Sequence, residues 1–273
     1  MKYQPGLPQH NDNISDEHPL KDFVVITAWL LAFSVLAFWL LGLAIDATVD
    51  SMSPATEARL HAMLPAQAVT SEPKAAAQQV QLQAMVDSMR ACARLTLPSK
   101  VAVSASAVPN AMVVPGGQII VFSGLFKQVK SENGLAYVLA HEMAHVTQRD
   151  HLRALGRGIV LFGMAALLTG SDSGLSELLT PVGNLGQAKY SRTREAAADM
   201  AALRILHCRY GHAGGATEFF EAMRDEEQSL FGLTHYAASH PAMQERIDAL
   251  NAAIKASGMP VQPGVPLQIA PIK

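Results

Sequence analysis

The chain has 273 residues, of which 49% are apolar and 16% charged, and its net charge is -2 at neutral pH. This length suits one sizeable domain with attached segments, and the low charged fraction is what a membrane segment would cause. The small net charge, without a run of Lys or Arg, argues against a nucleic-acid-binding surface. The only cysteines, Cys92 and Cys208, are too few for a disulfide scaffold and lack the close spacing of a cysteine zinc site. The sequence leaves open whether these two cysteines pair.

The N-terminal part predicts a membrane anchor. Residues 1–22 are polar and turn-rich, and we interpret them as a disordered tail. Residues 23–45 contain no charged side chain and would extend roughly 34 Å as a helix, against a hydrocarbon core of about 30 Å. A core helix would carry a polar stripe, and a signal peptide would have a shorter apolar region nearer the start. We therefore predict one transmembrane helix. Lys2 and Lys21 precede it, which favours an inward N-terminus and a translocated C-terminal domain.

A juxtamembrane linker and the start of a folded domain follow. Residues 46–78 contain three prolines among Ala, Ser and Gln, and we interpret them as a linker with one short helix at most. We expect the catalytic domain over residues 79–256, beginning with an apolar stripe at helical spacing. In residues 111–122, two β-branched runs flank Pro115 and Gly116, a pair that suits a type II turn. This segment predicts a β-hairpin.

Helices account for most of the remaining domain. Residues 159–168 form an apolar run that is too short to span a bilayer, and we favour a buried helix over a membrane-dipping or substrate-covering segment. The proline-rich residues 257–273 predict an extended tail. The other predicted helices cover residues 134–155, with Ser131 or Asn133 near the cap, residues 192–208, residues 219–228, and a last helix that begins at Pro241.

One motif on the predicted helix 134–155 carries the chemistry. His141, Glu142 and His145 belong to the sequence His-Glu-Met-Ala-His. Positions four apart project from the same helix face, so both imidazoles can bind one ion while Glu142 lies beside them without binding it. Zinc lowers the pKa of its bound water from about 15.7 to about 7, and Glu142 can act as the general base when water attacks a peptide carbonyl. The alternative is a chance coincidence on a solvated helix face.

A third ligand must come from elsewhere, because a catalytic zinc has three protein ligands and one position open for water. Glu195 lies on the alanine-rich helix that follows, with Asp199 four residues later on the same face. Glu195 can complete the site while Asp199 accepts a hydrogen bond from the free ring nitrogen of a ligand histidine. Alone, this pair would suit a solvated face beside Arg192 and Arg194. The preceding motif favours the metal site.

Several motifs in the same order resemble those of the M48 family of zinc peptidases, over roughly residues 80–250. The matching segments are Asn110-Ala111 with Pro115-Gly116-Gly117 and Ser123-Gly124-Leu125, Leu139 to His145, Tyr190-Ser191-Arg192 with Glu195 and Ala198-Asp199, and His240-Pro241 with Arg246-Ile247.

The resemblance implies a gluzincin-like α+β fold, mostly helical with a small β-sheet or hairpin, and endopeptidase activity with one Zn²⁺ per chain. It also implies that a substrate strand pairs with an edge of the sheet, near residues 112–114 or 119–122. Only one convincing span precedes the domain, which favours quality control of misfolded or membrane-proximal polypeptides over prenyl-protein processing. We therefore expect a single-pass protein of a bacterial inner membrane, with a periplasmic catalytic domain, the lipid bilayer as a partner, and no nucleic acid.

His240 precedes Pro241, which fixes the backbone at the start of the last predicted helix. We predict that His240 faces the metal. There it could stabilise the oxyanion of the reaction or, as the resemblance suggests, occupy the open metal position as a latch. The alternative is that it only caps the helix.

Two other functions use the same residues. One is a non-catalytic peptidase-like module that acts as a chaperone or adaptor, although a purely structural zinc would need a fourth ligand and no general base such as Glu142. The other is a different metal-dependent hydrolase, such as an amidase, because cleft shape sets the substrate and the sequence does not display it.

Overall fold

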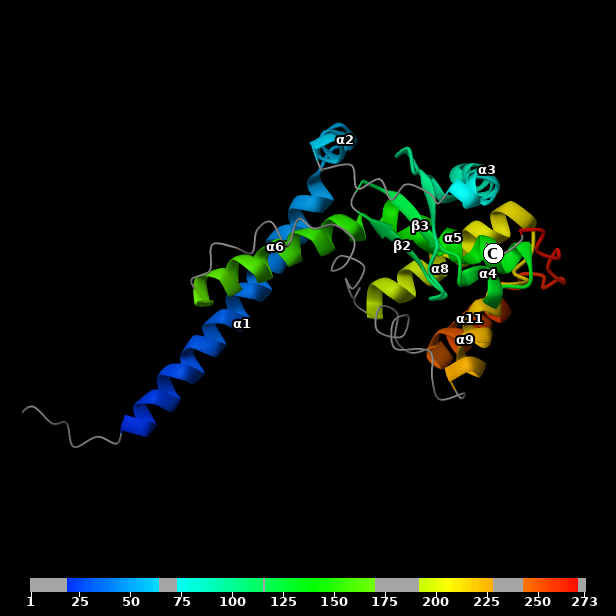
Figure 1. Ribbon diagram of the computed structural model, residues 1–273. Helices are drawn as coiled ribbons and strands as arrows, with labels where there is room; N and C mark the ends of the chain where they lie inside the picture. The colour runs from blue at the N-terminus through cyan, green and yellow to red at the C-terminus, as the bar shows by residue number, and fades with distance from the viewer. Residues whose placement is uncertain (1–18, 64–72, 115, 170–191, 228–242, 270–273) are drawn as a thin grey trace, which may run out of the picture. The chain divides into compact units, whose positions relative to one another are not determined.

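The computed structural model describes residues 19–63, 73–114, 116–169, 192–227 and 243–269 (Figure 1). The chain divides into two compact units, Met1–Ala44 and Ile45–Lys273. Most of the predicted N-terminal tail lies outside the described residues.

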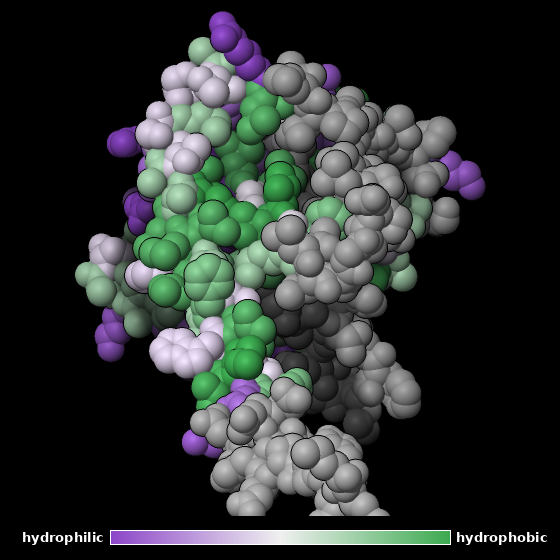
Figure 2. Space-filling model, turned by 90° about the vertical axis from the view of Figure 1, so that its left-hand side faces the viewer, coloured by the Kyte–Doolittle hydropathy of each residue, from purple (hydrophilic) through white to green (hydrophobic). Residues whose placement is uncertain are grey.

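The first unit contains most of helix α1 (Pro19–Ser51), which extends past both ends of the predicted 23–45 span. It is long and apolar enough to cross a membrane, and its most apolar window is not buried. Figure 2 shows a face of the molecule on which green hydrophobic residues predominate among those that are not grey. Large apolar side chains such as Trp29 and Phe33 are 73% and 69% exposed. An exposed apolar surface of this kind marks a site that contacts a membrane or a protein partner.

The second unit is mostly helical with one small sheet, so the predicted α+β class is confirmed. After the end of α1, its elements are α2 (Pro54–Met63), the 3-10 helix η1 (Pro73–Ala75), α3 (Ala76–Ala93), β1 (Val101–Ser104), β2 (Ala111–Val114), β3 (Gln118–Phe122), α4 (Leu125–Gln128), α5 (Glu132–Thr147), α6 (Asp150–Thr169), α8 (Arg192–Tyr210), α9 (Glu218–Glu227) and α11 (Met243–Ser257).

The sheet has the strand order β1-β3-β2, with β1 parallel and β2 antiparallel to β3. The predicted hairpin is confirmed. At its turn, the amide of Gly117 donates to Val114 O at 3.0 Å and Gly116 has φ 104°, as a type II turn requires of its third residue. Because β3 is paired on both sides, a substrate strand cannot add at residues 119–122. Of the two expected pairing sites, the one at residues 119–122 is therefore wrong. β2 remains an edge of the sheet.

Helix α5 lies at the centre of the domain, since every residue from Asn133 to Val146 is buried. Its N-cap is Ser131, whose side chain accepts from the amide of Gly134 at 2.9 Å. α8 is its most extensive neighbour, and α3 and β2 also contact it. Small side chains on both helices, among them Ala140 of α5 and Ala202 of α8, are fully buried in the core. His141, Glu142 and His145 therefore lie in a buried part of the domain.

The predicted helix 134–155 is in fact two helices. α5 ends at Thr147, and α6 begins at Asp150 after Arg149, whose φ of 58° is left-handed and interrupts a regular helix. Within α6, Ile159 and Leu161 are 53% and 54% exposed, so the apolar run is not buried at these positions.

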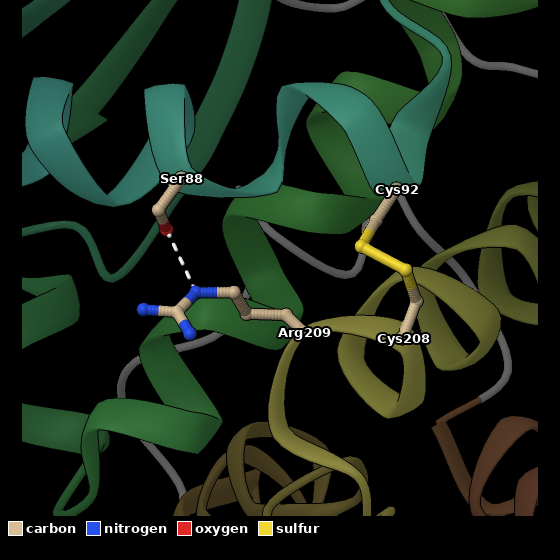
Figure 3. The surroundings of a disulfide bond; sticks show 4 residues. All are labelled: Ser88, Cys92, Cys208 and Arg209. Carbon is tan, nitrogen blue, oxygen red and sulfur yellow. Dashed lines mark hydrogen bonds between the residues drawn. A yellow bond between two sulfur atoms is a disulfide. The ribbon is translucent and has the colours of Figure 1, made fainter.

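Two long-range connections tie the domain together. Cys92 of α3 and Cys208 of α8 form a disulfide bond, with their Cα atoms 5.8 Å apart (Figure 3). Beside it, Arg209 Nε donates to Ser88 Oγ at 3.0 Å. At the C-terminal end, the amide of Leu267 donates to Lys130 O at 2.9 Å, and Ile269 is buried. The described part of the predicted tail therefore packs against the domain.

Candidate metal centre

Three ligand-type side chains meet between α5 and α8. His141 and His145 project from one face of α5, one turn apart, and Glu195 faces them from α8. Their ligand atoms all lie within 4.8 Å of one another, and all three residues are buried. The structure thus brings together the three residues predicted to bind zinc, and the group could hold a metal ion.

The spacing of these atoms suits a tetrahedral ion. The two Nε2 atoms are 3.1 Å apart, and the carboxylate oxygens of Glu195 lie 3.5 Å from His141 Nε2 and 3.4 Å from His145 Nε2. Tetrahedral zinc with bonds of about 2.0–2.1 Å places neighbouring ligand atoms roughly 3.3 Å apart. Two imidazoles and one carboxylate are also a usual set of ligands for a catalytic zinc. The residues present therefore fit this ion.

The second nitrogen of each ring is held by its own carboxylate. His141 Nδ1 lies 3.0 Å from Asp199 Oδ1, and His145 Nδ1 lies 2.9 Å from Asp150 Oδ2. A carboxylate accepts, so each Nδ1 carries the proton and each neutral ring presents the lone pair of Nε2. The two Nε2 atoms are 3.1 Å apart, so a proton or a metal ion can lie between them. The carboxylates thus set the tautomers that a shared metal ion requires.

The same carboxylates raise both histidine pKa values in the metal-free protein. Burial alone would lower the pKa of His141, but hydrogen bonds and charges from Asp199 and Glu195 more than offset this effect and raise the pKa to about 9. Burial also opposes the charged form of His145, yet Asp150 and Glu195 raise its pKa. The carboxylates thus create a negative potential at the two imidazoles, which also favours binding of a metal cation.

Arg246, part of the last matching motif, holds Asp199 in place. Arg246 Nε and Nη2 donate to the two oxygens of Asp199 at 2.8 and 2.6 Å, and the Tyr137 hydroxyl donates at 3.1 Å. Burial would raise the pKa of Asp199, but His141 and Arg246 lower it well below its usual range. The guanidinium also lies over the Phe220 ring, 4.2 Å from its centroid. Arg246 thus keeps Asp199 ionised and correctly placed.

Sequence reasoning missed Asp150, the carboxylate on His145. In a continuous helix, residues five apart point in different directions, so no helical pattern links Asp150 to His145. The left-handed Arg149 between the two helices turns Asp150 back toward the ring. The available signal was chemical: a metal-bound histidine needs a partner for its second nitrogen, and Asp150 is the nearest following carboxylate.

Glu142 lies next to His141 in α5 and is 3% exposed. A cavity of about 470 Å³ opens beside the ligands and is lined by residues of α8 and α11, including Glu195, Met200 and Arg246. His240 and Tyr190 lie outside the described residues, so the role of His240 stays a prediction.

Comparisons with known proteins find a matching family model and several similar sequences. The family model described as Peptidase family M48 matches residues 76–254, which include every site residue described above. Mitochondrial metalloendopeptidase OMA1 of Schizosaccharomyces pombe is 35% identical over 143 residues, covering 51% of this chain and 42% of the relative. The putative beta-barrel assembly-enhancing protease of Vibrio cholerae is 31% identical over 153 residues, covering 50% and 31%. The Escherichia coli beta-barrel assembly-enhancing protease is 28% identical over 173 residues, covering 56% and 34%. The alignments thus cover less than half of each relative.

Proposed function

The chain belongs to peptidase family M48, and from this we propose that it is a zinc-dependent endopeptidase anchored in a membrane by α1. The observation that carries the proposal is the buried cluster of His141, His145 and Glu195, with Glu142 beside it. Three protein ligands leave a fourth zinc position open, which distinguishes a catalytic from a structural site.

Each residue then has a defined task. Zinc, when bound, would polarise the peptide carbonyl and make water acidic enough to attack it. Glu142 would take the proton from the attacking water and pass it to the nitrogen of the departing amine. Asp199 and Asp150 would hold the two rings in the tautomer that binds metal.

The substrate we propose is an extended polypeptide. β2 is an edge strand, and it contacts α5, the helix that carries the zinc motif. A substrate strand added to β2 would receive main-chain hydrogen bonds with little regard to its sequence. The cavity beside Glu195 would accept a side chain of the substrate. Recognition of this kind suits the quality control of misfolded or membrane-proximal proteins.

Casein digestion by the purified full-length protein in detergent tests the activity. We expect internal cleavage that stops when a chelator removes the metal and returns when one equivalent of zinc is added, because the proposed mechanism needs the metal to activate water. Fragment masses would show that cleavage is internal. Binding of casein without cleavage, in a protein that holds zinc, would instead support the chaperone or adaptor alternative.

We further propose that the domain lies on the periplasmic side of a bacterial inner membrane. The apolar part of α1 supplies the anchor. The Cys92–Cys208 disulfide joins two helices of the catalytic domain, and structural disulfides persist in oxidising compartments such as the periplasm. The disulfide therefore supports an oxidising compartment independently of the charges that flank the anchor.

Thiol trapping in intact cells checks the location. In acid-quenched cells, Cys92 and Cys208 should resist a maleimide reagent until the protein is reduced, because a periplasmic disulfide stays oxidised. In the Cys92→Ser protein, Cys208 should react without reduction, which controls for simple burial. Full reaction of both cysteines in unreduced, unaltered protein would place the domain in the cytoplasm. Recovery of the intact chain in the soluble fraction without detergent would contradict the anchor.

A further inference from the structure

The last turns of α1 belong to the catalytic unit, which begins at Ile45. They carry Asp46 and Asp50 but no basic residue. Acidic residues at a helix C-terminus have the unfavourable sign for the helix dipole, so they need partners from outside the helix. Arginines of α6 provide them: Arg157 Nη2 lies 2.8 Å from Asp46 Oδ2, and Arg153 pairs with Asp50.

These partners connect Asp46 to a metal ligand. Arg194 Nη2 lies 3.4 Å from Asp46 Oδ1, and its Nη1 donates to Asp150 Oδ1 at 2.6 Å. Arg153 makes a parallel connection, with Nε 3.3 Å from Asp46 Oδ1 and Nη1 3.7 Å from Asp150 Oδ1. The other oxygen of Asp150 holds His145 Nδ1 at 2.9 Å. Asp46 at the end of α1 is therefore linked through one arginine side chain to Asp150, the carboxylate that orients His145.

The charges in this cluster balance. Three arginines (Arg153, Arg157 and Arg194) face three aspartates (Asp46, Asp50 and Asp150). Asp150 is fully buried, and the side chains of Arg153 and Arg194 are 8% and 23% exposed, so water screens these charges only in part. Without the charge of Asp46, the two arginines on Asp150 would lose their shared second anion. They would compete more strongly for Asp150 and add positive charge near a site for a dication.

We propose that Asp46 and Arg194 are positioning residues of the metal centre, so that the C-terminal end of α1 supports the zinc site and is not only a tether. They act through Asp150, which sets the orientation of the His145 ring. This inference rests on the proposed zinc function. Hydrogen-bond partners of metal ligands typically change metal affinity by about 10- to 100-fold, and residues one step further out should have a smaller effect.

Zinc affinity in the full-length protein, measured by competition with a chelator, tests the proposal. Asp150→Asn should raise the zinc dissociation constant about 10- to 100-fold, and Asp46→Asn and Arg194→Gln about three- to tenfold. The visible spectrum of the cobalt-substituted protein should shift in all three variants, because it reports the geometry of the ligands. Asp46→Glu, which keeps the charge, should restore both readouts. Asp248→Asn makes the same change on the exposed face of α11 and should alter neither.

Two results would overturn the inference. One is an Asp46→Asn protein with the zinc affinity and cobalt spectrum of the unaltered chain. The other is weaker zinc binding with an unchanged cobalt spectrum and a lower unfolding temperature of the metal-free protein, since that combination means general destabilisation. If the unaltered chain binds no zinc, the proposed zinc function is wrong as well. If the unaltered chain binds zinc and only the variants fail to behave as predicted, only the roles of Asp46 and Arg194 are wrong.

Discussion

Replacing Glu142 with glutamine should leave the zinc in place and remove nearly all peptide hydrolysis. The substitution keeps the size of the side chain but removes the carboxylate that accepts a proton from water. Loss of a general base typically lowers a rate by about 10² to 10⁴. Zinc should stay bound because the three proposed ligands, two from α5 and one from α8, are unchanged.

Metal analysis and casein digestion of the same preparation check both parts of this prediction. Glu221→Gln, on α9, makes the same chemical change outside the metal centre and should digest casein normally. Digestion at the unaltered rate by Glu142→Gln would exclude Glu142 as the general base. Loss of zinc from this variant would mean that Glu142 binds the metal, against the proposed roles.

Replacing Glu195 with glutamine should remove most of the zinc and, with it, the activity. Glu195 is 3% exposed, and its two oxygens face the two histidine Nε2 atoms. A neutral amide is a poorer ligand for zinc, and it also removes the charge from the 3.3 Å contact between Glu195 and Arg246 Nη1. The protein would then also lose the stabilisation that zinc adds to the folded state, which is about 2.7 kcal/mol at a free ligand concentration 100 times the dissociation constant.

The measurement is zinc content after gel filtration, together with the rise in unfolding temperature on adding zinc. The unaltered chain should carry one zinc and unfold at a higher temperature when zinc is added. Glu195→Gln should show little of either effect, and Glu221→Gln should match the unaltered chain. A Glu195→Gln protein that retains one zinc with unchanged affinity would require a different third ligand.

The sequence was most informative where helical spacing fixes geometry. His141 and His145 are four residues apart, and in an α-helix this spacing places both side chains on one face. Glu195 was harder, because nothing local links it to them. The need for a third ligand and the small residues around it indicated that its helix could come close, and the structure places it there. Their roles as zinc ligands stay predictions.

Features that depend on tertiary contacts could not be predicted from the sequence. The break at Arg149 divides one expected helix into two and turns Asp150 toward His145. β1 has only four residues and is stabilised by its pairing with β3, so no local pattern marks it. The Cys92–Cys208 bond spans 116 residues, a pairing that the sequence left open. Each of these features results from tertiary contacts, which a local pattern does not contain.

Crystallographic anomalous scattering at the zinc edge, on the full-length protein, tests the central claim most directly. The account predicts one anomalous peak per chain, bonded to His141 Nε2, His145 Nε2 and a carboxylate oxygen of Glu195, with bonds of about 2.0–2.2 Å and a fourth position open to water. A peak at any other group of residues, or a fourth protein ligand that closes the site in the presence of bound substrate, would contradict it.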